Sequence, residues 1–237
     1  RRWPRAKSSL RRSKKADAGL IDGCHLDEAG FSMTLPPCRS WFPEGERLKV
    51  AYEAPQRRRV NAIGAHFTHG PEAGRFEAQS WAGLPTSRAK QQRQTAEQVA
   101  AAHGLREEQV EPIDSARVVA FIWRAAGRGS AAPAGWKRAR PLMVVLDNYS
   151  VHKSQVVAEA VVQLEAADVH LVYLPAYSPE LSRIEPDWND IKQHQLPGRS
   201  FDQVAELKGA VDDALVRKAH QLQQAHAKTT GLRRSDT

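Results

Sequence analysis

Three acidic residues stand at the expected ends of strands or starts of helices, where their side chains could assist chemistry at a phosphate. Asp27 follows the run Gly-Cys-His-Leu, and Asp147 follows the uninterrupted apolar run Leu142–Leu146. Glu185 comes directly before Pro186, and because proline favours the first position of a helix, we expect Glu185 at a helix start. Ligand sites in open α/β sheets lie at the carboxyl ends of strands, so Asp27 and Asp147 stand where a site is expected.

Carboxylates that meet at one edge of a sheet make an all-oxygen site suited to Mg²⁺ or Mn²⁺. Cleavage of a phosphodiester bond needs an activated nucleophile and a stabilised leaving oxygen, and two metal ions about 3.5–4 Å apart provide both. The sequence has no GxxxxGK(S/T) loop, which excludes a Walker-type nucleotide site. Two alternatives stay open at this point: each acid could be purely structural, or Asp147 could serve a phosphotransfer or hydrolase domain acting on small substrates.

The order of the strands and helices expected around these acids indicates an α/β fold with one mixed sheet. Short extended segments separated by Pro and Gly predict an antiparallel meander over residues 19–26, 30–35, 48–52, 59–68 and 76–81. The second half alternates apolar strands with helices, which predicts parallel strands at 142–146 and 169–174 and helices at 154–167, 186–195 and 201–220. An antiparallel meander followed by β/α units predicts a single sheet with flanking helices.

Between these two halves lies the polar stretch 86–112, for which we expect one helix at about Ala96–His103. Asp114 is a suitable N-cap for an amphipathic helix that runs to about Ala126. A loop rich in Gly, Ala and Pro, residues 127–135, separates that helix from the strand before Asp147.

The positive charge of the chain is concentrated at its beginning. The net charge is +8 and the pI is about 9.7. Residues 1–15 hold eight basic residues and no acid, which leaves 35 − 8 = 27 basic residues against 27 acidic ones. We therefore expect a basic arm over residues 1–17, a domain over 18–220 and a polar basic tail over 221–237. The arm is either a solvated linker or a phosphate-binding segment, whose candidate contacts are Arg11, Arg12, Lys14 and Lys15.

Cysteine usage and hydropathy predict an intracellular protein without a membrane partner. Cys24 and Cys38 have no zinc-finger spacing, so we expect two buried thiols in a reducing compartment rather than a metal site with His25. The longest apolar runs, such as Val118–Trp123, are far shorter than the roughly 20 residues that cross a bilayer. The sequence does not open on a secretory leader.

Three sequence blocks follow one another between residues 27 and 192: DEAGF (27–31) with SWFPEG (40–45), LMVVLDNYSVHKS (142–154) and LVYLPAYSPELSRIEPDWNDIK (171–192). They resemble the catalytic blocks of DDE transposases, specifically the bacterial insertion-sequence branch of the mariner-like superfamily. The second and third acids are 185 − 147 = 38 positions apart, which is compatible with that family. The resemblance implies an RNase H-like fold, DNA cleavage and strand transfer, and Asp27, Asp147 and Glu185 as ligands of two Mg²⁺ or Mn²⁺ ions.

The resemblance also implies contacts with DNA. Asn148 and His152 belong to the second block, and His152 would contact the substrate, orient a neighbour or cap the following helix. Asn189 and Lys192 share one helix face with Glu185, so both are expected to face DNA, with Lys192 at a phosphate. The expected partners are transposon ends, a target DNA with a TA site and a second copy of the chain in a homodimer. The expected location is the bacterial cytoplasm, at the nucleoid.

Four residues near the three acids are expected to have other roles. Asp22 is a rival for the first acid, but it lacks the Glu-x-Gly-Phe context that follows Asp27. Glu28 is expected to be a surface or capping residue. Trp188 and Ile191, on the other stripe of their helix, are expected in the core.

The sequence departs from the family pattern in two ways. Ser182 and Arg183 stand where the family usually has Asn and a small residue or Pro. The family's N-terminal helix-turn-helix region has no counterpart before Asp27, and since the chain begins with Arg1 we expect it to be a fragment. A decayed or domesticated copy that binds DNA without cutting it is therefore the alternative to an active transposase core.

Overall fold

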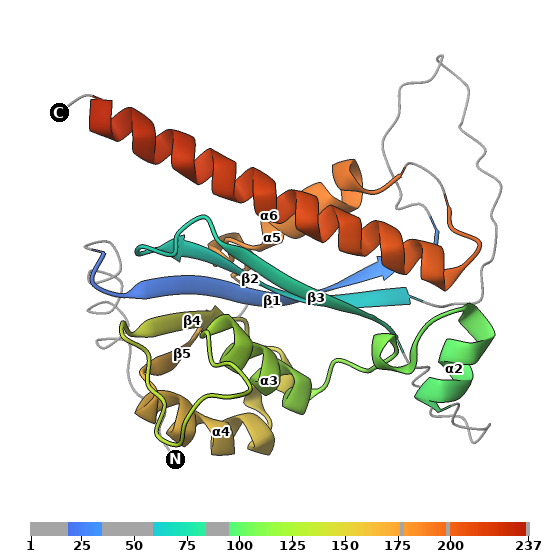
Figure 1. Ribbon diagram of the computed structural model, residues 1–237, viewed down its shortest axis with the longest axis horizontal. Helices are drawn as coiled ribbons and strands as arrows, with labels where there is room; N and C mark the ends of the chain where they lie inside the picture. Colours follow the sequence, from blue (N-terminus) through green and yellow to red (C-terminus); the bar gives the residue numbers. More distant parts are fainter. Residues whose placement is uncertain (1–18, 35–58, 84–94, 176–177, 198–199, 236–237) are drawn as a thin grey trace.

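A five-stranded mixed sheet forms the middle layer of the protein (Figure 1). The computed structural model describes residues 19–34, 59–83, 95–175, 178–197 and 200–235. The sheet has the order β3-β2-β1-β4-β5, with β1 antiparallel to β2, β2 antiparallel to β3, and both β4 and β5 running parallel to β1. The strands are β1 (Asp22–Ser32), β2 (Arg59–His69), β3 (Phe76–Ala82), β4 (Leu142–Leu146) and β5 (Val169–Tyr173). The expected mixed sheet is confirmed.

Helices cover both faces of this sheet (Figure 1). α3 (Ser115–Ala125) and α4 (Gln155–Ala166) lie on one face, and α5 (Glu185–Asp190) and α6 (Val204–Ser235) lie on the other. Helix α2 (Ala96–His103) occupies the residues predicted for it, and its capping box joins Thr95 to Gln98. Short helical segments lie at η1 (Glu107–Gln109), η2 (Ser150–Lys153), η3 (Pro179–Leu181) and η4 (Ile191–Gln195), of which η4 is a π-helix.

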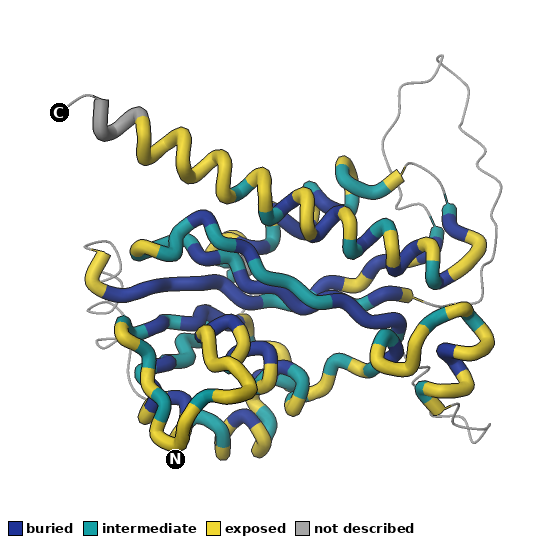
Figure 2. The backbone as a smooth tube through the Cα atoms, viewed as in Figure 1, coloured by how far each residue is buried: buried dark blue, intermediate teal, exposed yellow. Residues whose placement is uncertain are grey.

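Two hydrophobic cores lie on the two faces of the sheet, and β1 contributes to both because its side chains alternate. Cys24 and Leu26 pack with α3 and α4, whereas Ala29 and Phe31 pack with α5 and α6. Figure 2 shows the resulting buried band through the central strands. Asp27, an odd-numbered residue like Ala29 and Phe31, therefore belongs to the face that α5 and α6 cover.

Strand β1 differs from the prediction. We expected one strand to end at Leu26 and another to begin at Gly30, but β1 is continuous through Asp27. Its pairing with β2 runs from Gly23 to Ser32, so the neighbouring strand holds Asp27 and Glu28 extended despite their low strand propensity. Asp27 therefore lies inside a strand. It stands at the point where β1 passes the end of the shorter strand β4.

Helix α6 is longer than predicted. We expected it to end at His220, with a polar tail after it, but the helix continues to Ser235. Gln, Ala and Lys dominate the extension and are good helix formers, so the loss of amphipathic pattern after His220 does not end the helix. The extension is mostly exposed and projects beyond the sheet (Figure 2).

Predicted helix caps agree with the structure. The carboxylate of Asp114 accepts a hydrogen bond from the backbone N–H of Arg117 at the start of α3. The predicted strand 48–52, the block 40–45, Cys38 and the basic arm lie outside the described residues. Among the helices that are described, none has the length and apolar content to pass through a bilayer.

Candidate active site

Asp27 and Asp147 lie side by side on neighbouring parallel strands. His25 pairs with Val145, an offset of 145 − 25 = 120 positions, and 147 − 27 = 120 as well. The same register thus places Asp27 level with Asp147, which directly follows the last residue of β4. Asp147 stands at the carboxyl end of its strand, as predicted, where open α/β sheets carry their sites.

Glu185 comes from α5, and the segment before that helix is tied to β1. Glu185 is the first residue of α5, with Pro186 directly after it, as predicted. The backbone N–H of Arg183 donates to Nδ1 of His25 over 3.3 Å. His25 shares the face of Asp27 and stands two residues before it on β1. This hydrogen bond brings the start of α5 to the same edge as the two aspartates.

A tight contact seats α5 on the sheet directly beside Asp27. Asp27 pairs with Gly64 of β2, and the ring of the buried Trp188 lies over Gly64. A Cβ atom at Gly64 would lie 2.7 Å from Cη2 of Trp188, well inside van der Waals contact. Only glycine leaves room for this ring, and the ring in turn fixes the distance of α5 from β1 and β2.

Buried charges hold α5 from two further sides. Asp187 accepts from Nδ1 of His66 on β2 over 2.7 Å. Nζ of Lys218, on α6, lies 2.6 Å from a carboxylate oxygen of Asp190 and 3.7 Å from one of Asp187. Asp187 and Lys218 are both buried, so the ion pair between these two is shielded from water. Asp187 is an acid near the site, but its partners give it a structural role.

The electrostatics of Asp27 indicate that the three acids share one neighbourhood. Burial raises the pKa of Asp27 from its usual 3.8 to about 7, and a backbone hydrogen bond opposes the rise. The negative charges of Glu28, Asp147 and Glu185 raise this pKa further. Both other acids of the predicted triad are thus close enough to act on the charge of Asp27. A bound cation would relieve the repulsion among them.

Asp147 is held by a buried histidine. Nδ1 of His152 lies 2.8 Å from Oδ1 of Asp147, and Nε2 lies 2.9 Å from Oε1 of Glu28. The imidazole is fully buried, whereas half of the Asp147 side chain is exposed. Burial lowers the pKa of His152, but the hydrogen bond to Glu28 and the charges of Glu28 and Asp147 outweigh it and raise the pKa overall.

These contacts correct two predictions. Glu28 is not a surface or capping residue, because its side chain is largely buried and bonds to His152. His152 does not cap the following helix, because Oγ of Ser154 accepts the hydrogen bond from the N–H of Val157 at the start of α4. His152 was also predicted to contact DNA, but its full burial leaves orientation of a neighbour as the role that the geometry supports.

A family model for the DDE superfamily endonucleases matches residues 86–208, which is 123 of the 237 residues. The chain belongs to this family. The match contains Asp147 and Glu185 and begins after Asp27. No curated protein sequence matches the chain.

Solved structures of the Mos1 transposase have the same fold as this DDE endonuclease. A paired-end complex with the left transposon end has a TM-score of 0.51 at 15% identity, covering 92% of this chain and 56% of that one. A pre-cleavage Mos1 transpososome has a TM-score of 0.52 at 15% identity, covering 94% of this chain and 58% of that one. A Mos1 mariner paired-end complex with Mn has a TM-score of 0.52 at 14% identity, covering 92% of this chain and 57% of that one. The RNase H-like prediction is confirmed, and the chain spans little more than half of the length of these proteins.

The donor set of this DDE endonuclease fits a hard divalent cation in its chemistry. Asp27, Asp147 and Glu185 offer only carboxylate oxygens, the donors that Mg²⁺ and Mn²⁺ prefer. Their mutual effect on the pKa of Asp27 gives a region of unbalanced negative charge. Within the described residues, no three Asp, Glu, His or Cys side chains form a ready-made metal cluster. The acids are thus neighbours of the right type that do not form a closed ligand cage.

The other predicted DNA contacts have varied surroundings. Nδ2 of Asn148 donates to the carbonyl of Leu174 over 2.5 Å and so joins the ends of β4 and β5. Asn189 is exposed on α5, and Nζ of Lys192 lies 5.9 Å from the ring centre of Phe31. Trp188 and Ile191 are buried, as predicted. Arg11, Arg12, Lys14 and Lys15 lie outside the described residues.

Asp22, the rival for the first acid, has a structural role. It is fully buried at the start of β1, and its Oδ2 accepts from Arg138 over 2.8 Å. Arg138 also contacts Glu72 over 2.8 Å, so Asp22 belongs to a separate charge network. Cys24 is buried, as predicted, and burial raises the pKa of its thiol to about 12.

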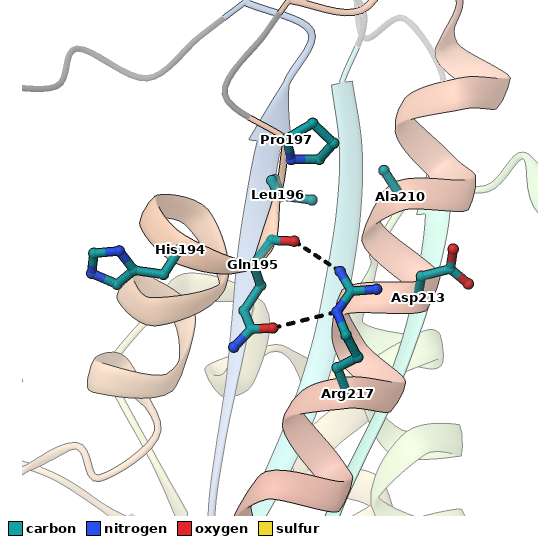
Figure 3. Close-up of a pocket in the computed structure, with 7 residues that line it drawn as sticks. All are labelled: His194, Gln195, Leu196, Pro197, Ala210, Asp213 and Arg217. Atoms are coloured by element: carbon teal, nitrogen blue, oxygen red, sulfur yellow. Dashed lines mark hydrogen bonds between the residues drawn. The ribbon is translucent and has the colours of Figure 1, made fainter.

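A pocket between η4 and α6 lies apart from the acids (Figure 3). Arg217 lines this pocket, and its guanidinium donates to the backbone carbonyl of Gln195 over 2.8 Å. Neither Asp27, Asp147 nor Glu185 lines it. The pocket is lined by His194, Gln195, Leu196, Pro197, Ala210, Asp213 and Arg217.

Proposed function

We propose that this protein is the catalytic core of a DNA transposase, which cleaves DNA strands and transfers them to a target. One observation carries the proposal. In a chain of the DDE endonuclease family, Asp27 and Asp147 stand level on adjacent strands while Glu185 acts on the same neighbourhood from α5. Strand cleavage and strand transfer are both in-line displacements at a phosphate, and a cluster of carboxylates suits them.

The three acids would hold the metal ions of the reaction. Two Mg²⁺ or Mn²⁺ ions, when bound, would activate the attacking oxygen and stabilise the leaving oxygen. Asp27 and Asp147 present carboxylates from the rigid sheet, and Glu185 presents a third from the start of α5. The mariner paired-end complex with Mn supports the choice of metal.

The proposed partners are DNA and a second copy of the chain. One Mos1 structure of the same fold is a paired-end complex with the left transposon end, which supports binding of such ends. We extend the proposal to a target DNA with a TA site. Asn189, exposed on α5, and Lys192, partly buried on η4, are proposed to contact the phosphate backbone. The basic residues of the first 15 positions are proposed to add contacts that weaken with salt.

The test is nicking of a supercoiled plasmid by the 237-residue chain with Mg²⁺ or Mn²⁺. We expect nicks that disappear with EDTA and in Asp147→Asn and Glu185→Gln, while the far-UV circular dichroism stays as in the wild type. Asp22→Asn is the matched control, because it removes a carboxylate from the same sheet that pairs with Arg138 and is not one of the three site acids. Equal nicking by the wild type and both site variants would refute the proposal.

The alternative is a copy that binds DNA without cutting it. Two observations favour it: the described acids do not form a ready-made metal cluster, and the exposed Arg183 stands two residues before Glu185. This alternative predicts DNA binding that is independent of divalent metal and a plasmid that stays supercoiled with either ion. Binding without nicking would select it.

A further inference from the structure

We propose that Glu28 and His152 form a positioning pair that fixes the orientation of the Asp147 carboxylate. The inference rests on the proposed function, in which Asp147 holds metal. Neither Glu28 nor His152 is a member of the acid triad. Their role follows from the contacts around one buried imidazole ring, which joins β1 to the segment after β4.

The imidazole of His152 bridges two carboxylates. One ring nitrogen lies 2.8 Å from Asp147 and the other 2.9 Å from Glu28, so both polar atoms of the ring are used. The ring is fully buried, and rotation would leave a buried nitrogen without a partner, which costs free energy. Glu28 therefore fixes the ring, and the ring fixes Asp147.

The backbone of His152 is anchored as well. The hydroxyl of Tyr173 on β5 donates to the carbonyl oxygen of His152 over 2.7 Å. His152 is thus held by Glu28 at its ring and by Tyr173 at its backbone carbonyl. These contacts come from β1 and β5, the two strands on either side of β4, so the position of the ring is set by the sheet itself.

The two donors to Asp147 converge on one of its oxygens. Oδ1 accepts from His152 and also from the backbone N–H of Tyr149, over 2.9 Å. Oδ2 has no hydrogen-bond donor in the part of the chain that the structure describes. One oxygen thus orients the carboxylate and the other is left for a cation. Loss of the hydrogen-bonding partners behind a metal ligand commonly weakens metal affinity about 10–100-fold.

The experiment measures Mn²⁺ binding to the whole chain by calorimetry, together with plasmid nicking. We expect Glu28→Ala and His152→Ala each to weaken Mn²⁺ binding about 10–100-fold. Glu28→Gln keeps an oxygen that can accept from the ring, so we expect it to stay close to the wild type. Glu72→Gln is the control, because Glu72 is also a partly buried glutamate paired with a cation, Arg138, in a separate network.

The double variant decides between positioning and general support of the fold. If Glu28 acts through His152, the double variant Glu28→Ala/His152→Ala binds Mn²⁺ no more weakly than His152→Ala alone. If the two residues instead supported the fold independently, their separate losses of Mn²⁺ affinity would multiply in the double variant. Chemical unfolding of each variant separates lost stability from lost affinity, and Glu28→Ala alone still tests the idea if His152→Ala does not fold.

The possible outcomes separate the two proposals. Wild-type affinity in Glu28→Ala, or multiplied losses in the double variant, overturns the positioning pair and leaves the proposed function standing. A wild-type chain that neither binds Mn²⁺ nor nicks DNA overturns the proposed function and the pair with it. Weakened binding in Glu28→Ala, recovery in Glu28→Gln and a neutral Glu72→Gln support the pair.

Discussion

The raised pKa of Asp27 predicts that the metal-free protein loses stability as the pH rises. The carboxyl of the unfolded chain titrates near 3.8, and burial together with the neighbouring acids moves the folded value to about 7. Between these values the folded state keeps a proton that the unfolded state has released. The contribution of Asp27 is therefore present below pH 3.8 and falls by about 1.36 kcal/mol per pH unit until about pH 7.

The perturbation is Asp27→Asn, which keeps the shape of the side chain and removes the titration. A shift of about three pKa units corresponds to an upper limit of about 4 kcal/mol. We expect the variant and the wild type to have similar free energies of unfolding near pH 4. Above pH 7 the variant is expected to be more stable, by up to about 4 kcal/mol. This is an unusual gain for the loss of a site residue.

The assay is urea unfolding in EDTA from pH 4 to 8, followed by tryptophan fluorescence. Burial lowers the pKa of His25 to about 4, so His25 stabilises the fold as the pH rises through this window and opposes Asp27. His152, whose pKa is raised, acts in the same direction as Asp27 at higher pH. Both contributions cancel in the difference between variant and wild type. That difference is the quantity to plot.

Divalent metal should reduce the difference in stability between Asp27→Asn and the wild type. A cation that binds only the folded wild type stabilises it by about 2.7 kcal/mol at 100 times its Kd. Saturating Ca²⁺ or Mn²⁺ at pH 8 is expected to raise the stability of the wild type and to have little effect on Asp27→Asn. A difference that stays flat from pH 4 to 8, with no response to metal, would refute the electrostatic coupling of the three acids.

Two further substitutions test the frame around the site. Gly64→Ala places a methyl group against the ring of Trp188 and should cost about 1–3 kcal/mol in urea unfolding and slow plasmid nicking. The control Gly209→Ala, in open space on α6, should be neutral or stabilising by up to about 1 kcal/mol, and equal effects of the two changes would contradict the seat of α5. Asp22→Asn breaks a fully buried pair with Arg138 and should cost about 3 kcal/mol, while Mn²⁺ affinity by calorimetry stays that of the wild type. A large loss of affinity would reinstate Asp22 as a site acid.

The parts of the fold that could be predicted from sequence are those with local signals. Apolar runs such as Leu142–Leu146 mark strands covered on both faces, and Asp114 marks the start of a helix. The continuity of β1 could not be predicted, because Asp27, Glu28 and Gly30 are poor strand formers that a partner strand holds in place. The extension of α6 was missed because a helix without an apolar stripe resembles a polar tail.

In the site, too, the features with local sequence signals could be predicted and those that depend on distant residues could not. The positions of Asp147 and Glu185 follow from their own flanking residues. The hydrogen bond between Glu28 and His152 joins residues 124 positions apart, and the contact of Trp188 with Gly64 spans 188 − 64 = 124 positions as well. One signal for Glu28 was present. It alternates with Asp27 on a central strand, so a charge there must face a covered layer and needs a partner.

Strand β1 carries two neighbouring acids that serve opposite layers, and this sets a limit on length changes in the strand. Inserting or deleting one residue before Asp27 would exchange the layers that Asp27 and Glu28 face, and the imidazole would meet the wrong carboxylate. A change of two residues would restore the alternation but shift both acids past the end of β4. The spacing from Gly23 to Glu28 is therefore expected to tolerate exchanges of side chains far better than any change in the number of residues.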